Sequence, residues 1–214
     1  FHDLGGRFAA FEQAVAADSH QRAASVSSEI DRAAARFRDL DRLLAESGYA
    51  ELPRRIVHND CKINNVMLDD ASGEGLCVID LDTVMEGTIL CDFGELVRTG
   101  TSRSPEDEVD LASISLDLDL FRAASRGYLA GAAPLLTEAE VEILPLAGSV
   151  MALENAIRFL TDHLIGDVYF RIHREGHNLD RFRAQLRLVE LMGERHSEMQ
   201  AIVEEAWREI RARA

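Results

Sequence analysis

Two regions with helical periodicity flank a short segment of different character, and this contrast limits the folds open to the chain. In residues 20–47, apolar side chains recur at steps of three and four residues, which is typical of an amphipathic helix. Residues 51–101 instead combine short β-branched runs, glycine-rich turns and acidic residues. The sequence therefore predicts a mostly α-helical α+β fold, with a small β element between two helical parts, 1–50 and 102–214.

The expected helices cover most of the chain, which has only four prolines to interrupt them. Asp18 or Ser19 is expected to cap the second helix, and Gly48 to end it. The sequence TEAE at 137–140 predicts a capping box, and LPLAG at 144–148 is a place where the helix that follows could break. The expected helices are 7–17, 20–47, 105–131, 137–164 and 181–212, with Leu111, Ile114, Leu118, Phe121 and Tyr128 as core residues of the third.

The β element is expected to be a hairpin. Residues 65–69 and 76–80 are partly apolar and β-branched, and the turn signal DDASGEG connects them. A shorter apolar piece at residues 56–57 precedes them. The sequence GTILCDFGELVRTG at 87–100 predicts a loop that leads into a short helix, and 166–180 a loop with glycine, aromatic and basic residues.

The composition excludes several classes of protein. The formal net charge of −15 argues against nucleic acid as a partner, because binding phosphate backbones needs a basic face. Cys61, Cys77 and Cys91 are odd in number and lack CxxC spacing, which predicts a reducing, cytoplasmic location without disulfides or structural zinc. No signal peptide and no apolar run of transmembrane length are evident, so no membrane partner is expected. Because the first residue is Phe1 rather than methionine, we expect a piece of a longer product.

Acidic and amide residues gather in the β segment. A turn-linked hairpin would bring Asn65, at the start of one strand, near Asp80, at the end of the other. A carbonyl oxygen and a carboxylate that converge in this way suit Mg²⁺, which prefers hard oxygen ligands. The whole group consists of Asp60, Asn64, Asn65, Asp80, Asp82 and Asp92.

This group fits phosphoryl transfer, which needs positioning, metal charge and a carboxylate that accepts the proton of the acceptor hydroxyl. Asp60 would be that base, and Asn65 and Asp80 would hold Mg²⁺ on the phosphates of a nucleotide. Lys62 is the only lysine in a chain with 22 arginines. Its compact ammonium group could lie beside the transferring phosphoryl group, in a space that the planar guanidinium of arginine would not fill.

The segment HNDCKINN (58–65) resembles the catalytic loop of protein-kinase-like enzymes, H-x-D-x-K-x-x-N, and more narrowly that of the aminoglycoside phosphotransferase (APH) family of small-molecule kinases. VIDLD (78–82) resembles the metal-binding segment of that family, and CDFGELVR (91–98) its downstream Asp-containing segment. Within the family, the resemblance is greatest to kinases of N-acetylhexosamines, and it extends to 155–164 and 166–181. It implies the carboxy-terminal lobe of the protein-kinase-like (APH-type) fold.

The resemblance also implies roles for individual residues. Asp60 becomes the catalytic base, with Lys62 beside it. Asn65 and Asp80 become ligands of the metal and of the nucleotide, with Asp82 as an additional metal ligand. The implied cofactor is Mg²⁺, with ATP as co-substrate.

Other implied roles have simpler alternatives. Arg158 and Tyr169 are candidates for contact with a sugar, but they could instead serve as an ion-pair partner and a packing residue. Asp82 could be a plain strand-end carboxylate, and Asp60 and Asn65 alone could be turn formers. Asp92 and His58 are expected to brace the loop rather than touch the substrate. His173 and His177 have the spacing of a metal pair, but no third ligand is evident and Gly176 weakens the helix they would need.

A complete kinase of this fold has a second, amino-terminal lobe, whose strand lysine pairs with the phosphates of the nucleotide. Lys62 cannot be that lysine, because it lies in the catalytic loop, and no β-rich stretch precedes residue 50. We therefore expect residues 1–214 to be one lobe, with the amino-terminal lobe of the same enzyme as its missing partner. Alone, it should bind ATP weakly.

Three functions stay open at this point. The first is phosphorylation of the anomeric hydroxyl of an N-acetylhexosamine by the longer enzyme. The second is an isolated lobe that acts as a binding module without turnover. The third is a kinase for an aminoglycoside, choline or a homoserine-like alcohol. The set Asp60, Asn65 and Asp80 favours an enzyme, since a binding module has no need for a base and metal ligands.

Overall fold

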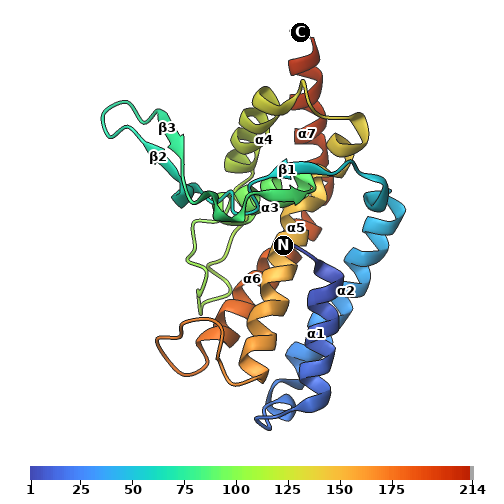
Figure 1. Cartoon of the computed structure of the whole chain (residues 1–214), viewed down its shortest axis with the longest axis vertical. Coiled ribbons are helices and arrows are strands. Elements are labelled where there is room, and N and C mark those ends of the chain that lie inside the picture. Colours follow the sequence, from blue (N-terminus) through green and yellow to red (C-terminus); the bar gives the residue numbers. More distant parts are fainter. Residues whose placement is uncertain (213–214) are drawn as a thin grey trace.

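The computed structural model of the protein describes residues 1–212 (Figure 1). The helices are α1 (Leu4–Ala17), α2 (Ser27–Glu46), α3 (Ile89–Gly100), α4 (Leu118–Ala132), α5 (Glu138–Leu164), α6 (His177–Glu194) and α7 (His196–Arg211). The strands are β1 (Arg55–Val57), β2 (Val66–Leu68), β3 (Gly75–Val78) and β4 (Met85–Gly87). The predicted mostly helical α+β class is confirmed.

Helix α5 is the centre of the fold, and it packs against α1, α2, α3, α6 and α7 (Figure 1). Two glycines let the helices approach closely. A Cβ atom on Gly94 of α3 would lie 2.4 Å from the carbonyl oxygen of Ala147, and one on Gly148 would lie 2.5 Å from Val97 Cγ1. Helix α3, which follows the β segment directly, is therefore fixed against the core at close range.

The hydropathy of α5 corrects one expectation. By length and composition, Glu138–Leu164 could cross a membrane, although we expected no apolar run of that length. The helix is this apolar because it lies in the core, where 89% of its most apolar 18-residue stretch is buried. Such a helix is apolar on all sides because other helices surround it.

The strands form two small antiparallel pairs. In the predicted hairpin, β2 pairs with β3, and Val66 lies opposite Val78. Strand β1 pairs with β4, and Val57 lies opposite Met85. The hairpin projects from the helical body (Figure 1). The segment 58–65 therefore begins at one strand pair and ends at the other.

The predicted helix 105–131 is wrong in its first half, because residues 102–117 form turns and irregular backbone and α4 begins only at Leu118. The Asp110 side chain accepts the backbone N–H of Ala112, and the Asp117 side chain accepts those of residues 119 and 120. Such local bonds compete with a helix. Ile114 and Phe121 are buried as expected, while the other three predicted core residues of this segment (Leu111, Leu118 and Tyr128) are half-buried.

The predicted start of the second helix is also wrong. Asp18 ends α1 in a left-handed conformation, and its carboxylate accepts the backbone N–H groups of Arg22 and Ala23. These bonds hold a 3₁₀ turn, and α2 begins only at Ser27. Gly48 follows the helix with a positive φ of 73°, in agreement with the expected end.

Two further boundaries differ from the prediction. Helix α5 does not break at LPLAG, because Pro145 lies inside a helix that is packed on every side and this packing offsets a cost of about 3 kcal/mol. The predicted capping box of Thr137 and Glu140 is confirmed. The last predicted helix is two helices, α6 and α7, which meet at Arg195, and α6 begins at His177 rather than residue 181.

Candidate active site

The segment that resembles a catalytic loop follows β1 and is held by helix α3. His58 and Asn59 donate backbone hydrogen bonds to the Asp92 carboxylate, at 3.0 and 2.7 Å. The His58 ring accepts the backbone N–H of Asp60 on Nδ1 and donates from Nε2 to the Ile79 carbonyl oxygen, at 3.3 and 3.1 Å. Asp92 therefore braces the loop as expected, and the His58 ring connects the loop with the residue that follows β3.

Asn59 turns the backbone immediately before Asp60. Its φ of 65° is left-handed, a conformation that asparagine tolerates better than most residues. The Asn59 side-chain amide donates to the Thr83 carbonyl oxygen at 2.9 Å. The Asn59 carbonyl oxygen accepts a hydrogen bond from His2 Nε2 at 2.8 Å. The other ring nitrogen of His2 lies 2.8 Å from the buried Glu154 carboxylate. The position of Asp60 is thus set by contacts from α5, the amino terminus and the turn before β4.

The Asp60 carboxylate has one oxygen held and one open. Oδ2 accepts hydrogen bonds from Lys62 Nζ at 2.7 Å and from the Asn65 amide at 2.9 Å. The same amide also donates to the Asp60 carbonyl oxygen at 3.0 Å. Within residues 1–212, no donor bonds to Asp60 Oδ1. The structure therefore brings together the three predicted residues Asp60, Lys62 and Asn65.

Asp80 and Asp82 lie at the end of the hairpin, in the turn that follows β3. The backbone N–H of Ile79 donates to the Asn65 carbonyl oxygen at 2.9 Å, which places Asp80 beside the end of the catalytic loop as predicted. Hydrogen bonding with Asp82 and its negative charge raise the pKa of Asp80, and Asp60 adds to this effect. Two exposed carboxylates in this arrangement repel each other until a proton or a cation lies near both.

The donor set fits Mg²⁺. It consists of two carboxylates and the amide of Asn65, whose nitrogen faces Asp60 and whose oxygen is left for another partner. In the part of the chain that is described, no three His, Cys, Asp or Glu side chains form a complete metal site. Mg²⁺ does not need one, because it usually binds through one or two carboxylates together with nucleotide phosphates and water.

The histidine pair at 173 and 177 does not look like a metal site. His177 Nδ1 accepts the backbone N–H of His173 at 3.1 Å, and its Nε2 lies 2.9 Å from the Asp107 carboxylate. Both ring nitrogens of His177 are therefore in use, in agreement with the expectation from sequence.

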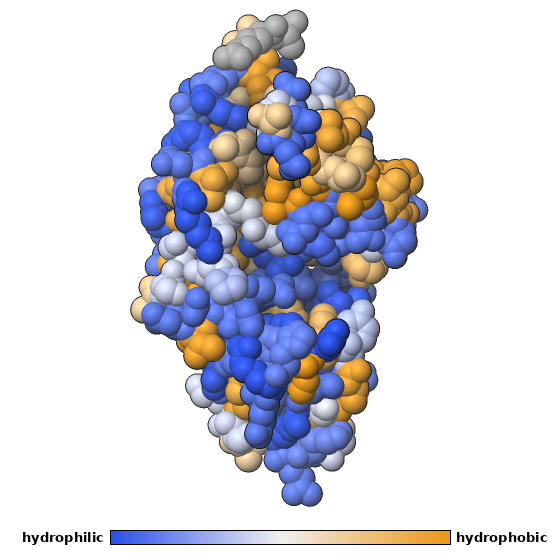
Figure 2. Space-filling view, turned by 90° about the vertical axis from the view of Figure 1, so that its left-hand side faces the viewer, coloured by the Kyte–Doolittle hydropathy of each residue, from blue (hydrophilic) through white to orange (hydrophobic). Residues whose placement is uncertain are grey.

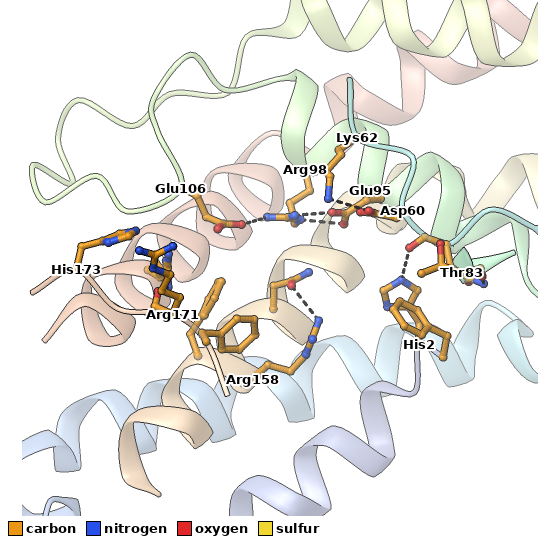
Figure 3. A pocket seen from close by; sticks show the side chains of 16 residues that line it. His2, Asp60, Lys62, Thr83, Glu95, Arg98, Glu106, Arg158, Arg171 and His173 are labelled. Atoms are coloured by element: carbon orange, nitrogen blue, oxygen red, sulfur yellow. Dashed lines mark hydrogen bonds and ion pairs between the residues drawn. The ribbon is translucent and has the colours of Figure 1, made fainter. Parts of the chain in front are cut away.

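A pocket of about 370 Å³ opens beside Asp60 (Figure 3). Asp60, Lys62 and Thr83 line one side, and Arg171 and His173 lie across from them. The remaining lining comes from the amino terminus, from α3, α5 and α6, and from the segments that follow α3 and α5. This volume is in the range of sites for small molecules.

The two predicted sugar contacts have different positions. Arg158 lines the pocket, and its guanidinium lies 5.2 Å from the ring centre of Phe170 and 5.7 Å from that of Tyr169. Tyr169 is 73% exposed and lines a neighbouring hollow of about 210 Å³ on the other side of Arg158. Arg158 and Asp60 therefore line the same pocket. Tyr169 contacts Arg158 but does not line that pocket. The alternative of an ion pair at Arg158 finds no carboxylate within 4.0 Å in residues 1–212.

Sequence reasoning missed a largely buried charge network in the wall of the pocket. Arg98 bonds to Glu95, to Glu106 at 2.8 Å and to Gln185 at 3.2 Å. Burial alone would lower the pKa of the Arg98 guanidinium, but the two carboxylates raise it overall. The spacing of Glu95 and Arg98 on one helix was a usable signal. Glu106 was not, because its segment was expected to be helical.

The arginines of the far wall, Arg171 and Arg181, were missed as well. They lie in or next to the loop 166–180, which was noted as aromatic and basic, but no motif connects them with Asp60. The packing of α6 and of the preceding loop against α5 brings them to the pocket.

Comparison with known protein families places the chain in a family. A model of the phosphotransferase enzyme family (APH) matches residues 2–134, which is more than half of the chain. The match includes the catalytic loop, the hairpin with Asp80 and Asp82, and Asp92, and it ends before α5. With its catalytic-loop motif folded around Asp60 and its acidic pair at the hairpin end, the chain belongs to the phosphotransferase enzyme family.

Proposed function

We propose that the protein transfers the γ-phosphoryl group of ATP to a hydroxyl group of a small molecule bound in the Asp60 pocket. The Asp60 carboxylate is the observation that carries this proposal. Its Oδ2 is held by Lys62 and Asn65, while its Oδ1 receives no donor from residues 1–212. A fixed carboxylate with one open oxygen, on the wall of a pocket, suits a group that accepts a proton from a bound hydroxyl.

The reaction needs few groups from the protein. The acceptor oxygen forms a bond to the γ-phosphorus, the bond from this phosphorus to ADP breaks, and the hydroxyl proton passes to Asp60. Lys62, 2.7 Å from Asp60 Oδ2, orients the base and places a positive charge beside the transferring group. Asn65, Asp80 and Asp82 would hold Mg²⁺, which supplies positive charge to the phosphates when bound.

The finer proposal concerns the acceptor. The resemblance of the motifs to N-acetylhexosamine 1-kinase supports an N-acetylglucosamine or N-acetylgalactosamine unit, phosphorylated at the anomeric hydroxyl. An aminoglycoside, choline or a homoserine-like alcohol are the other acceptors to compare. A binding module without turnover is not favoured by any observation, because such a module would not need the held base.

The chain also exposes an apolar surface that suits a second lobe. Large side chains between residues 56 and 85 are widely exposed, among them Ile56 (75%), Leu76 (61%) and Leu81 (60%). Figure 2, with the hairpin side toward the viewer, shows hydrophobic residues gathered mainly in the upper half of that face. Exposed apolar patches of this kind usually mark an interface. We propose that this chain is the carboxy-terminal lobe and that an amino-terminal, nucleotide-binding lobe buries this apolar surface.

An acceptor panel tests the proposal. The full-length gene product should be assayed with ATP and Mg²⁺ against both N-acetylhexosamines, an aminoglycoside, choline and homoserine, with ADP release and ³¹P NMR of the product as readouts. A sugar 1-phosphate is the expected product. Its absence, with another acceptor phosphorylated, would exclude the hexosamine, and no ADP release with any acceptor would argue against the phosphotransferase itself.

The two-lobe proposal has a separate test. Calorimetry of the 214-residue chain with ATP and Mg²⁺ should show little binding, because Asp80, Asp82 and Asn65 are only part of a nucleotide site. Micromolar affinity would contradict the need for a second lobe.

A further inference from the structure

Three arginines line the Asp60 pocket without a carboxylate partner. Arg158 comes from α5, Arg171 from the segment between α5 and α6, and Arg181 from α6. Arg158 donates one long hydrogen bond of 3.4 Å to the Asn155 side chain, and its guanidinium lies 5.2 Å from the ring centre of Phe170. Arg181 bonds to the Arg171 carbonyl oxygen and the Asn178 side chain, both at 3.2 Å. These contacts position the guanidinium groups without neutralising them.

Unpaired arginine is rare in this molecule. In residues 1–212, sixteen arginines lie within 4.0 Å of an Asp or Glu oxygen. Five do not, and they are Arg38, Arg158, Arg171, Arg181 and Arg208. Three of these five line one pocket. In a chain with 38 acidic residues, this concentration indicates a place where a negative charge is to come from outside.

Two acidic side chains at the start of the loop 166–180, Asp162 and Asp167, are committed to other partners. The Asp162 carboxylate accepts the backbone N–H groups of Val168, Tyr169 and Phe170, at 2.8 to 3.0 Å. Asp167 bonds to Arg22 at 2.5 Å. These bonds fix the loop that carries Arg171, so its guanidinium approaches the pocket from a constrained backbone.

The pocket as a whole has an excess of positive charge. Five permanent cations line it, against three carboxylates. The carboxylates are all engaged, because Asp60 bonds to Lys62, and Glu95 and Glu106 bond to Arg98. The remaining positive charge belongs to the arginine wall, which we define as Arg158, Arg171 and Arg181. Planar guanidinium groups bind carboxylates and phosphates through paired hydrogen bonds.

We propose that the acceptor carries an anionic group, a carboxylate or a phosphate, which the arginine wall binds across the pocket from Asp60. This inference rests on the proposed phosphoryl transfer and narrows its acceptor to a hydroxy compound with a negative charge, so that an N-acetylhexosamine fits only as an anionic derivative. The phosphates of the nucleotide are a less suitable ligand, because Asp80 and Asp82 do not line this pocket. Cationic acceptors such as aminoglycosides or choline would meet the wrong charge at this wall.

Matched acceptors test the inference in the full-length enzyme with ATP and Mg²⁺. One pair is N-acetylglucosamine and N-acetylglucosamine 6-phosphate, and the other is galactose and galacturonate. We expect the anionic member of at least one pair to have a kcat/KM at least about tenfold above its neutral partner, and the successful pair identifies the anion. Equal or better turnover of the neutral members would overturn the inference and leave the phosphotransferase intact.

A binding measurement separates this inference from the proposed function. Inorganic phosphate and galacturonate are titrated calorimetrically into wild type, Arg171→Gln, Arg181→Gln and the control Arg38→Gln, which removes an exposed, equally unpaired arginine on α2. Each pocket variant should weaken binding of one of the two anions about tenfold, and the control should not. Equal affinities in all four proteins, or no binding to wild type at millimolar concentration, would overturn the anion site. Binding without turnover of any acceptor would support this site and refute the phosphotransferase.

Discussion

The candidate active site contains two pairs of acidic residues, and the structure holds the two pairs in different ways. The Asp60 carboxylate accepts a hydrogen bond from the Lys62 ammonium group, and the Asp92 carboxylate accepts two from backbone N–H groups. Asp80 and Asp82 lie exposed at the base of the projecting hairpin, where the chain leaves β3. Hydrogen bonding and charge between them raise the pKa of Asp80. The fold holds the first pair in place and leaves only Asp60 Oδ1 open, whereas no other donor within residues 1–212 bonds to the carboxylates of the second pair.

This difference matches the demands of phosphoryl transfer. A base has to be in place before the acceptor arrives, because misplacement of a reacting group lowers the rate steeply. Ligands of Mg²⁺ arrive together with the nucleotide and need only the right oxygens within reach. Helix α3, pressed against α5 at Gly94, gives the first pair its rigid support, and the second pair has none comparable.

The largest effect is expected from Asp60→Asn. The amide can keep the contact with Lys62 but cannot accept a proton, so kcat should fall by about 10²–10⁴-fold while the fold is retained. Steady-state kinetics and circular dichroism of the full-length enzyme measure both quantities. Asp70→Asn, at an exposed position of the hairpin turn, is the matched control and should leave kcat unchanged. Full activity of Asp60→Asn would remove Asp60 as the base.

Asp92→Asn should break the support of the loop rather than the chemistry. The carboxylate accepts backbone bonds from His58 and Asn59, and the amide can accept only one of them. We expect a loss of about 1.5–3 kcal/mol in the free energy of unfolding, together with a lower kcat, measured by urea denaturation and kinetics. A variant with unchanged stability would show that the loop holds its shape without α3. The same Asp70→Asn variant serves as the control.

The sequence predicted those site residues that lie close to one another along the chain. Asp60, Lys62 and Asn65 lie within six residues, and a hairpin with a clear turn signal brings Asp80 next to them. The fold adds the far wall, which sequence spacing does not connect with Asp60. Arg158 and Arg171 reach the pocket only because α5 and the following loop pack across from the catalytic loop.

The helix predictions failed where local hydrogen bonds or tertiary packing override periodicity. Asp110 and Asp117 take backbone N–H groups and keep residues 102–117 out of a helix. Pro145 stays inside α5 because the helix is enclosed by its neighbours. In both places an interaction that the local sequence pattern does not report decided the structure.

The smallest effect is expected on the pKa of Asp80, and it tests the exposed pair Asp80 and Asp82 directly. Asp82→Asn removes the main cause of the raised pKa of Asp80, so this pKa should fall toward the ordinary value of an aspartate. In wild type, saturating Mg²⁺ should lower it as well, because a cation favours the charged carboxylate. NMR titration of the Asp80 side-chain carboxyl measures both effects, and Asp70→Asn should show neither change relative to wild type. An Asp80 pKa that stays raised in Asp82→Asn and falls only in Asp60→Asn would mean that Asp60 is the main source of the repulsion. The base and the metal ligands would then form a single acidic group, and the contrast between the two pairs would be lost.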